Sequence, residues 1–491
     1  STHCISSAAS DVYKRQIPVR RAVLNPGAPA MAFVRAAAED AYDRLIFPSV
    51  EREMRGLLTE QADEGAIKMF GLNLKPLLMQ PPVKGFVTMG LDPGYRNGCK
   101  VAVVDATGKV LDTAVVYPTF SQRKKEEAID TLAKLIRRHG VAHIAIGNGT
   151  ASRETEQMTV ELIRRLGGGV SYMIVNEAGA SVYSASKLAA EEFPDYDVNL
   201  RSAVSIARRL QDPLAELVKI DPKSIGVGQY QHDMPQARLD ETLSGVVEDC
   251  VNAVGVDLNT ASAPLLSYVA GLNNTTARNI VKYREENGAF TTRKGVLKVP
   301  KLGPKAFEQC AGFLRVQESR NVLDHTGVHP ESYGAAEALL ALCGYGLSDV
   351  KAGGLDGLRE RVAAYGEEKA AEVCGVGVPT LRDIVGELVK PGRDPRDELP
   401  RPILRTDVLE MKDLKPGMEL TGTVRNVIDF GVFVDIGVHQ DGLVHISQLR
   451  EGRRVQHPSE VCAVGDIVTV WVLEVDEKKK RISLTMKKPK G

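Results

Sequence analysis

Residues 430–447 read FGVFVDIGVHQDGLVHIS, and this stretch decides the fold of the C-terminal part of the chain. It holds two short apolar runs separated by polar and glycine residues, which is typical of two neighbouring β-strands. Phe430 and Phe433 stand on either side of a glycine, so they cannot both follow the alternating inward face of one strand. Five strand-like runs occupy residues 418–486 and predict an all-β domain over residues 411–488.

This domain resembles the OB domain that is repeated in the largest small-subunit ribosomal protein, and the resemblance spans residues 414–487. Such barrels bind single-stranded nucleic acid by stacking bases on aromatic side chains beside a basic groove. The alternative is that both phenylalanines belong to the hydrophobic core. The resemblance implies an RNA-binding surface with aromatic platforms at Phe430, Phe433 and His445, and phosphate contacts at Arg425, Lys480 and Arg481.

A linker precedes this domain. Residues 390–402 read KPGRDPRDELPRP, in which prolines alternate with charged residues. Such a composition buries almost nothing and favours an extended, solvated chain. We therefore expect a domain boundary here and assign residues 390–410 to the linker.

Residues 264–316 are predicted to form two short helix pairs, each with a tight turn. A glycine-containing turn lets backbone amides at the start of the second helix approach a phosphate, where the helix dipole favours the anion. The segment holds nine basic and three acidic residues, a net charge of +6 in a chain whose total is zero. The turns resemble helix-hairpin-helix motifs, and the alternative is that they mediate packing or protein contacts. Candidate backbone-binding residues are Gly271, Gly303, Lys301 and Lys305; a further helical domain is expected over 317–389.

Strand-like and helical runs alternate over residues 86–260. Three strands joined by short turns come first, and two helices that alternate with two strands follow. Strands that alternate with helices of this length imply parallel pairing with crossover connections. This order is that of the ribonuclease-H-like fold. The predicted strands are 86–91, 100–104, 110–117, 143–146 and 171–175, and the predicted helices are 126–139 and 154–166.

The sequence GLDPG at residues 90–94 places Asp92 at the end of the first of these strands. It resembles the YqgF branch of the ribonuclease-H-like nucleases and resolvases, in which clustered carboxylates hold metal ions that activate water. The fourth strand ends in GNG at 147–149, where many nucleases of this fold carry an acid. The resemblance implies a catalytic and metal-binding set of Asp92, Glu177 and Asp249. A metal-dependent nuclease or resolvase is therefore the alternative function; we favour a scaffold that binds one magnesium ion weakly and requires no cofactor.

The N-terminal part of the chain is predicted to be helical over residues 17–85. Apolar residues recur at helical spacing from Ala32 to Leu78, and Pro81 and Pro82 end the pattern. Residues 1–16 have no helical or strand period and resemble translated adapter sequence, so we exclude them from the fold prediction.

The order of these modules, with NEAGAS at 176–181 and IGVGQYQHD at 225–233, resembles the bacterial Tex family of transcription accessory proteins. The resemblance runs from about residue 36 to residue 488. Family members usually begin with a further helical region, so we expect the chain to be a fragment that lacks it. The resemblance implies a multidomain protein with α/β, all-α and all-β parts that acts around transcription. It implies RNA and single-stranded DNA as partners, with RNA polymerase or the ribosome as further candidates.

The composition narrows the class of protein. The 63 basic and 63 acidic residues cancel, so any basic surface must be local. The seven cysteines are widely spaced and form no C-x-x-C pair, which favours reduced thiols and no zinc site. We find no P-loop for an ATP-driven motor and no apolar run of about 18 residues. We therefore expect a soluble, cytoplasmic protein without a membrane partner.

Overall fold

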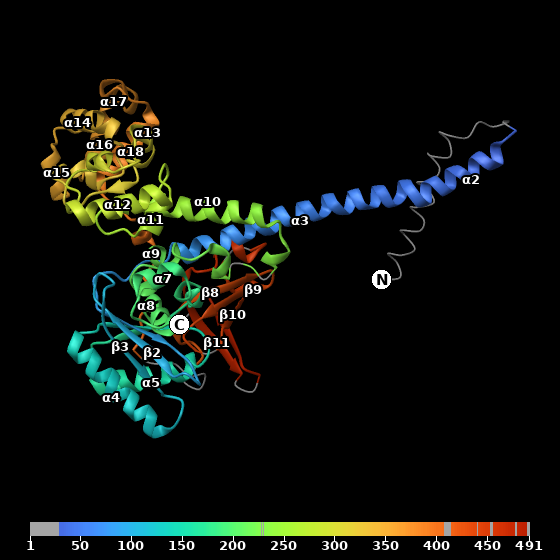
Figure 1. Cartoon of the computed structure of the whole chain (residues 1–491), viewed down its shortest axis with the longest axis horizontal. Coiled ribbons are helices and arrows are strands. Elements are labelled where there is room, and N and C mark those ends of the chain that lie inside the picture. Colours follow the sequence, from blue (N-terminus) through green and yellow to red (C-terminus); the bar gives the residue numbers. More distant parts are fainter. Residues whose placement is uncertain are drawn as a thin grey trace. The chain divides into compact units, whose positions relative to one another are not determined.

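The computed structural model describes residues 29–226, 228, 230–406, 414–438, 440–451, 455–476 and 479–488. The adapter-like residues 1–16 and the last part of the expected linker lie outside the described residues. The chain divides into two compact units. One unit holds the chain up to Met69 together with His232–Arg238, and the other holds Phe70–Gln231 and the residues from Leu239 onward. Figure 1 labels many of their helices and strands.

The first unit is helical, as its apolar periodicity predicts. Helix α2 (Met31–Ala41), the π-helical turn η1 (Tyr42–Ile46) and helix α3 (Phe47–Leu78) follow one another, and the last turns of α3 belong to the second unit. Val50, Met54 and Leu57 set the helical period but remain exposed in the unit. Neither α3 nor another helix among the described residues has the length and apolar character that crossing a bilayer requires.

The second unit contains the predicted ribonuclease-H-like domain. Strands β1 (Thr88–Asp92), β2 (Cys99–Val104) and β3 (Val110–Val116) form an antiparallel meander. Helix α4 (Gln122–His139), strand β4 (His143–Gly147), helix α5 (Ser152–Leu166) and strand β5 (Ser171–Val175) complete it. The sheet order is β3-β2-β1-β4-β5, and β4 lies parallel to both β1 and β5. The predicted order of strands and helices is confirmed.

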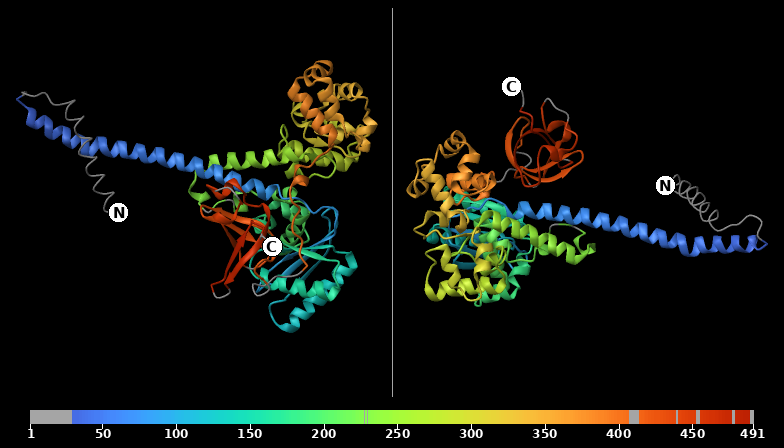
Figure 2. Two further views of the ribbon diagram at one scale, coloured as in Figure 1. Left: turned by 180° about the vertical axis from the view of Figure 1, so that it is seen from behind. Right: turned by 90° about the horizontal axis from the view of Figure 1, so that it is seen from above.

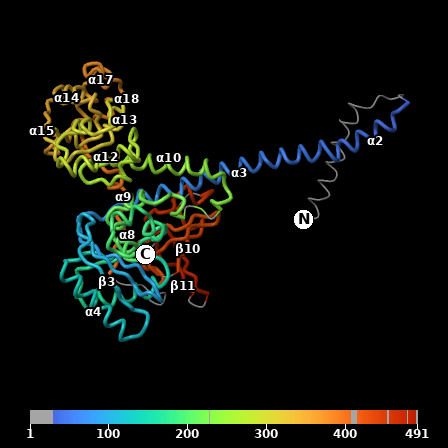
Figure 3. The backbone as a smooth tube through the Cα atoms, viewed as in Figure 1, coloured from blue at the N-terminus to red at the C-terminus, as the bar shows by residue number. Residues whose placement is uncertain are grey.

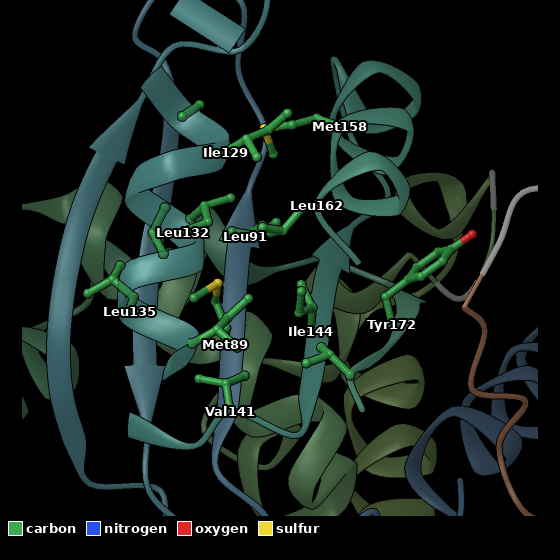
Figure 4. Packing of buried hydrophobic residues seen from close by; sticks show 14 of the residues in the cluster. Met89, Leu91, Ile129, Leu132, Leu135, Val141, Ile144, Met158, Leu162 and Tyr172 are labelled. Atoms are coloured by element: carbon green, nitrogen blue, oxygen red, sulfur yellow. The ribbon is translucent and has the colours of Figure 1, made fainter. Parts of the chain in front are cut away.

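Helices cover both faces of this sheet. Side chains of α4 and α5 pack with alternate residues of the strands in one buried apolar cluster, part of which is shown in Figure 4. Helix α8 (Val198–Gln211) packs on the other face, where Ala203 and Ala207 lie against β1 and β2. Gly90 permits this approach, because a Cβ at that position would overlap the Ala203 carbonyl oxygen. The small elements beside α8 are α6 (Ala180–Ser184), α7 (Lys187–Glu192), α9 (Pro213–Leu217), η2 (Pro222–Ile225) and η3 (Gln231–Asp233).

Two helical regions follow. The backbone in Figure 3 can be followed from α10 (Gln236–Val254) into α12 (Asn274–Asn287). The two predicted hairpins consist of α11 (Ala263–Ser267) with α12 and of the 3-10 helix η4 (Arg293–Lys298) with α13 (Pro304–Cys310). A short parallel ladder of β6 (Val256–Asp257) and β7 (Leu314–Arg315) joins the two ends of this region. The next region contains η5 (Val322–His325), η6 (Pro330–Ser332), α14 (Tyr333–Leu342), α15 (Leu347–Ala352), α16 (Leu358–Tyr365), α17 (Glu367–Cys374) and α18 (Val378–Val389).

The C-terminal domain is a closed five-stranded barrel, as its alternating pattern predicts. Strands β8 (Glu419–Ile428), β9 (Gly431–Asp435), β10 (Gly442–His445), β11 (Ile467–Asp476) and β12 (Arg481–Thr485) pair in the order β10-β12-β11-β8-β9. Every second residue of these strands points inward, so Val424, Val434, Val444 and Leu484 share one buried core. Figure 2 shows the barrel in red from two further directions.

The segment assigned to the linker is not solvated throughout, which corrects the expectation that it buries almost nothing. Arg396, in η7 (Pro395–Glu398), is 1% exposed. Its guanidinium pairs with Asp212 Oδ1 at 2.8 Å and with Asp394 Oδ2 at 2.7 Å, and Lys84 Nζ lies 3.2 Å from Asp212 Oδ2. Burial opposes ionisation of the Asp212 carboxyl, but the charge and hydrogen bonds of Arg396 outweigh it and lower its pKa. The segment therefore contacts the C-terminal end of α8 through Asp212.

We expect Arg396→Ala to lower the free energy of unfolding by about 1.5–3 kcal/mol, because it removes the buried cation from two partly buried carboxylates and leaves only Lys84 beside them. Far-UV circular dichroism during urea denaturation measures the change. Arg393→Ala is the matched control, since Arg393 pairs with Glu398 at the surface and should contribute less than about 1 kcal/mol. Because the folded pKa values of Asp212 and Asp394 are depressed, this contribution is present above their unfolded pKa values and is lost as the pH falls through the folded ones. Equal stability of the two variants at neutral pH would contradict the assignment.

Candidate nucleic-acid interface

The outer surface of β9 and β10 carries the predicted aromatic residues. Phe433 and Leu443 are register partners on these strands; Phe433 lies between two buried valines, and Leu443 lies between the buried Gly442 and Val444. His445 pairs with Gly431, and the preceding Phe430 is 53% exposed. The Ile446 N–H donates to the Phe430 carbonyl at 2.9 Å, and this bond joins the residue before β9 to the residue after β10. Phe430, Phe433 and His445 are therefore surface residues of one side of the barrel, and neither phenylalanine lies in the buried core.

The orientation of the His445 ring is fixed by its neighbour. Its Nδ1 lies 2.9 Å from Ser447 Oγ and accepts the Ser447 N–H at 3.3 Å. The His445 side chain is exposed at the end of β10. Leu443 was not identified from the sequence, although its alternation with Val444 gave the signal for an outward position. It lies between Phe433 on β9 and Ser483 on β12 and extends the apolar surface.

Basic residues surround this surface. Arg425 lies on the outer side of β8, and its Nη2 pairs with Asp435 Oδ2 at 2.6 Å. Arg481 begins β12, next to the β11–β12 turn that holds Lys480, and both are exposed. Lys480 has φ +51°, the left-handed region that non-glycine residues seldom adopt. The barrel thus combines aromatic and basic side chains on its surface, as single-strand binding requires.

The two hairpins differ in how open their turns are. Asn273 caps α12, because its side chain accepts the N–H groups of Thr275 and Thr276. Gly271 precedes it with φ +80°, and the place of a side chain at Gly271 is filled by Gln309. The amides of this first hairpin therefore have internal partners, and Gly271 serves the packing of α13 against the turn.

The second hairpin presents a more open turn. Gly303 caps α13 without a side-chain hydrogen bond, and a Cβ built at Gly303 meets nothing within 4 Å. Lys301 holds the left-handed conformation at φ +66°, and both Lys301 and Lys305 are exposed. The Asn279 side chain donates to the Pro300 carbonyl at 2.8 Å and joins the two hairpins. Of the four predicted hairpin residues, three therefore lie together on an accessible turn.

The charge of the hairpin region is smaller at the surface than the sequence suggests. Arg293 is fully buried and donates to the carbonyls of Val328, Leu323, Asp324 and Thr326. Arg284 donates to the Leu258 carbonyl, and Arg315 donates to the carbonyls of Gly312 and Leu314. Three of the nine basic side chains thus serve the fold. The other six basic side chains are exposed, and so are the three acidic side chains of the segment. The net charge at the surface is therefore +3.

Asp92 and Glu177 meet at one end of the ribonuclease-H-like sheet, where β1, β4 and β5 finish side by side. Burial raises the pKa of the Asp92 carboxyl, against the opposing effects of Ser202 and Lys100. Burial also raises the pKa of Glu177, and the charge of Asp92 raises it further. Two of the three predicted carboxylates are therefore close enough to affect each other.

The Glu177 carboxylate lies against Gly147 and Gly149 at the end of β4. A Cβ at Gly147 or at Gly149 would overlap its oxygens. Arg209, on α8, donates to the carbonyls of Asn176 and Ala178 on both sides of Glu177, at 2.7 and 2.8 Å. Arg209 is 3% exposed, and its burial lowers its pKa to about 10. Sequence reasoning missed this cation, since only the packing of α8 on the sheet places it there.

Asp249 does not join the other two carboxylates, which corrects the predicted three-acid set. It lies on the exposed side of α10, beside Cys250, whose pKa is raised by burial and, to a smaller extent, by the charge of Asp249. The helix that packs against β1 is α8, which offers Ser202, Ser205 and Arg209. Among the described residues, no three Asp, Glu, His or Cys side chains form a group that could hold a metal. Two acids beside a buried arginine and Lys100 do not offset a pair of divalent ions.

Known families match the chain segment by segment. The Tex protein YqgF-like domain matches residues 86–211, a helix-hairpin-helix motif matches 251–315, an HHH domain matches 321–396 and the S1 RNA binding domain matches 413–487. These four segments coincide with the sheet domain, the two hairpins, the α14–α18 region and the barrel.

Long relatives match almost the whole chain. The uncharacterised protein YdcI of Bacillus subtilis is 55% identical over 96% of the chain and 65% of its own length. The transcriptional accessory protein Tex of Neisseria gonorrhoeae is 57% identical over 90% of the chain and 57% of its own length. Protein YhgF of Escherichia coli is 54% identical over 94% of the chain and 58% of its own length. The chain thus spans about three fifths of the length of these relatives. On this identity and this order of domains, the chain belongs to the Tex family.

Proposed function

We propose that the chain is a nucleic-acid-binding protein whose barrel holds single-stranded RNA or DNA. The observation that carries this proposal is the outward surface of Phe433, Leu443 and His445, with Phe430 exposed beside it. Stacked bases gain about 1–3 kcal/mol each on such side chains, whatever their sequence. Exposed Arg481 and Lys480 supply the positive charge that a backbone needs.

The second hairpin adds a sequence-independent backbone contact. Its exposed Lys301 and Lys305 flank the open Gly303, so a phosphate can reach the backbone closely. The surface charge of +3 around the hairpins supports binding of a polyanion. The first hairpin supports the second through the Asn279 hydrogen bond.

The ribonuclease-H-like domain acts as a scaffold in this proposal. Its Asp92–Glu177 pair binds one magnesium ion weakly, and it cleaves slowly or not at all. The buried Arg209 favours this assignment, because it already offsets part of the charge that a cation would meet. The alternative is a metal-dependent nuclease or resolvase that uses Asp92 and Glu177.

The cellular role is also a proposal. One relative bears the name transcriptional accessory protein, and we infer a role around transcription in the cytoplasm for this chain. RNA polymerase and the ribosome are the candidate protein partners.

The double variant Phe430→Ala/His445→Ala should weaken single-strand binding by about 1–3 kcal/mol for each stacked base that is lost. Fluorescence anisotropy with a labelled oligouridylate measures the change. Leu473→Ala is the matched control, because Leu473 is also exposed on the barrel but lies on β11. If the folded double variant bound as tightly as the wild type, the aromatic surface would not be the binding site.

Gly303→Val should weaken binding to single-stranded DNA and leave the fold intact, because a side chain there meets open space and obstructs only the phosphate. The affinity of the wild type should fall steeply with salt. Lys305→Ala should reduce the slope of log affinity against log salt by about 0.7, which corresponds to the loss of one single-strand phosphate contact. Lys351→Ala, an exposed lysine on α15, is the control. An affinity that did not respond to salt would indicate that the hairpins contact protein.

Asp92→Asn should abolish weak Mn²⁺ binding, which electron paramagnetic resonance of added Mn²⁺ detects. Since the pKa values of Asp92 and Glu177 are raised, protons compete with the ion and its affinity should increase as the pH rises. We expect no turnover of branched or single-stranded DNA at enzyme-like rates. Rapid cleavage that Asp92→Asn removed would replace the scaffold with the nuclease.

A further inference from the structure

Arg405 lies outside the segment that matches the S1 domain, yet it contacts the barrel. Its backbone pairs with Tyr172 of β5, an outer strand of the ribonuclease-H-like sheet. The Tyr172 N–H donates to the Arg405 carbonyl at 2.7 Å, and the Arg405 N–H donates to the Tyr172 carbonyl at 2.8 Å. Tyr172 itself is fully buried. The sheet therefore fixes the point from which the Arg405 side chain extends.

The guanidinium of Arg405 reaches the carboxylate that also holds Arg425. Arg405 Nη2 lies 3.6 Å from Asp435 Oδ1, and Arg425 Nη2 lies 2.6 Å from Asp435 Oδ2. The Gly437 N–H donates to the same Oδ1 at 2.8 Å. Gly437 leaves room for the guanidinium, because a Cβ there would overlap it. One carboxylate on the barrel is thus shared by two arginines from different parts of the chain.

Two carboxyl groups and two guanidinium groups lie around Arg425, so the charge there is balanced only when Arg405 is included. Asp441 is close enough to act on both Arg425 and Asp435, and burial raises its own pKa. Without Arg405, one guanidinium would stand beside two carboxyl groups. With Arg405, positive and negative groups are equal in number. A backbone phosphate that approaches Arg425 therefore meets less repulsion when Arg405 engages Asp435.

We propose that Arg405 is a positioning residue for the nucleic-acid surface of the barrel: it holds Asp435 so that Arg425 is available to a backbone phosphate of single-stranded RNA. This inference rests on the proposed function of the barrel. Arg425 makes the phosphate contact, and Arg405 acts through Asp435. The ribonuclease-H-like sheet thereby contributes to the RNA surface although it touches no RNA.

The test uses the full chain and the anisotropy of a labelled oligouridylate at several salt concentrations. Arg405→Ala should weaken binding roughly three- to tenfold and lower the salt slope by about 0.7, the loss of one single-strand phosphate contact. Arg425→Ala should have the same effect, and the double variant should lose little more. When Asp435→Asn is added to Arg405→Ala, the affinity and the salt slope should return to the wild-type values. The added substitution removes the carboxylate that would otherwise pair with Arg425 in the absence of Arg405.

Controls separate this inference from a structural role and from the proposed function itself. Arg401→Ala removes an exposed arginine of the same segment and should bind as the wild type does. Weakened binding of Arg405→Ala that Asp435→Asn does not restore would mean that Arg405 only supports the fold, and would overturn the inference. Wild-type binding by Arg405→Ala, with Phe430→Ala/His445→Ala still weak, would overturn it and leave the proposed function standing. Absence of RNA binding by the wild type would overturn both.

Discussion

The buried guanidinium of Arg396 determines the path of the chain between the helical region and the barrel. It lies between the carboxylates of Asp212 and Asp394, where water contributes little screening. Because Asp212 ends α8, the pair attaches the segment to the same helix that covers β1. The next residues run to Tyr172, where Arg405 adds to the edge of the sheet. The position of Arg405 beside the barrel therefore depends on an ion pair formed nine residues earlier in the chain.

Several arginines in this chain serve the interior and not a ligand. Arg293 donates to a group of buried carbonyls that includes those of Val328 and Asp324, and Arg209 does the same for the turn that carries Glu177. A buried carbonyl without a donor is costly, so a planar group with five N–H donors is well suited to such turns. In consequence, local net charge overstates the charge available to a polyanion. Around the hairpins this use of arginine halves the value from +6 to +3.

Periodic features of the sequence predicted the fold well. Alternation of apolar residues identified the barrel strands, and it placed Phe430 and Phe433 outside a common inward face. The order of strands and helices identified the ribonuclease-H-like sheet. Features that depend on distant contacts were missed. Asp249 was assigned from the family resemblance, but the helix that packs on β1 through Gly90 is α8 and not α10, and no spacing in the sequence distinguishes the two helices. The burial of Arg396 depends on an aspartate 184 residues away, so local composition suggested a solvated linker. The hairpins look equivalent in sequence, and only the neighbours of Gly271 and Gly303 separate them.

The anchor at Tyr172 also sets a limit on how far the barrel can travel. From Arg405 to Leu414, where the barrel core begins, there are nine peptide steps, which span on the order of 30 Å when fully extended. If the Arg405–Asp435 pair opens while the backbone pairing persists, the barrel remains tethered within that radius of β5. Rebinding is then an intramolecular event, with an effective concentration in the millimolar range for a short tether. Opening of the Arg405–Asp435 pair alone therefore does not separate the barrel from the sheet, and the pair can form again without a second molecule.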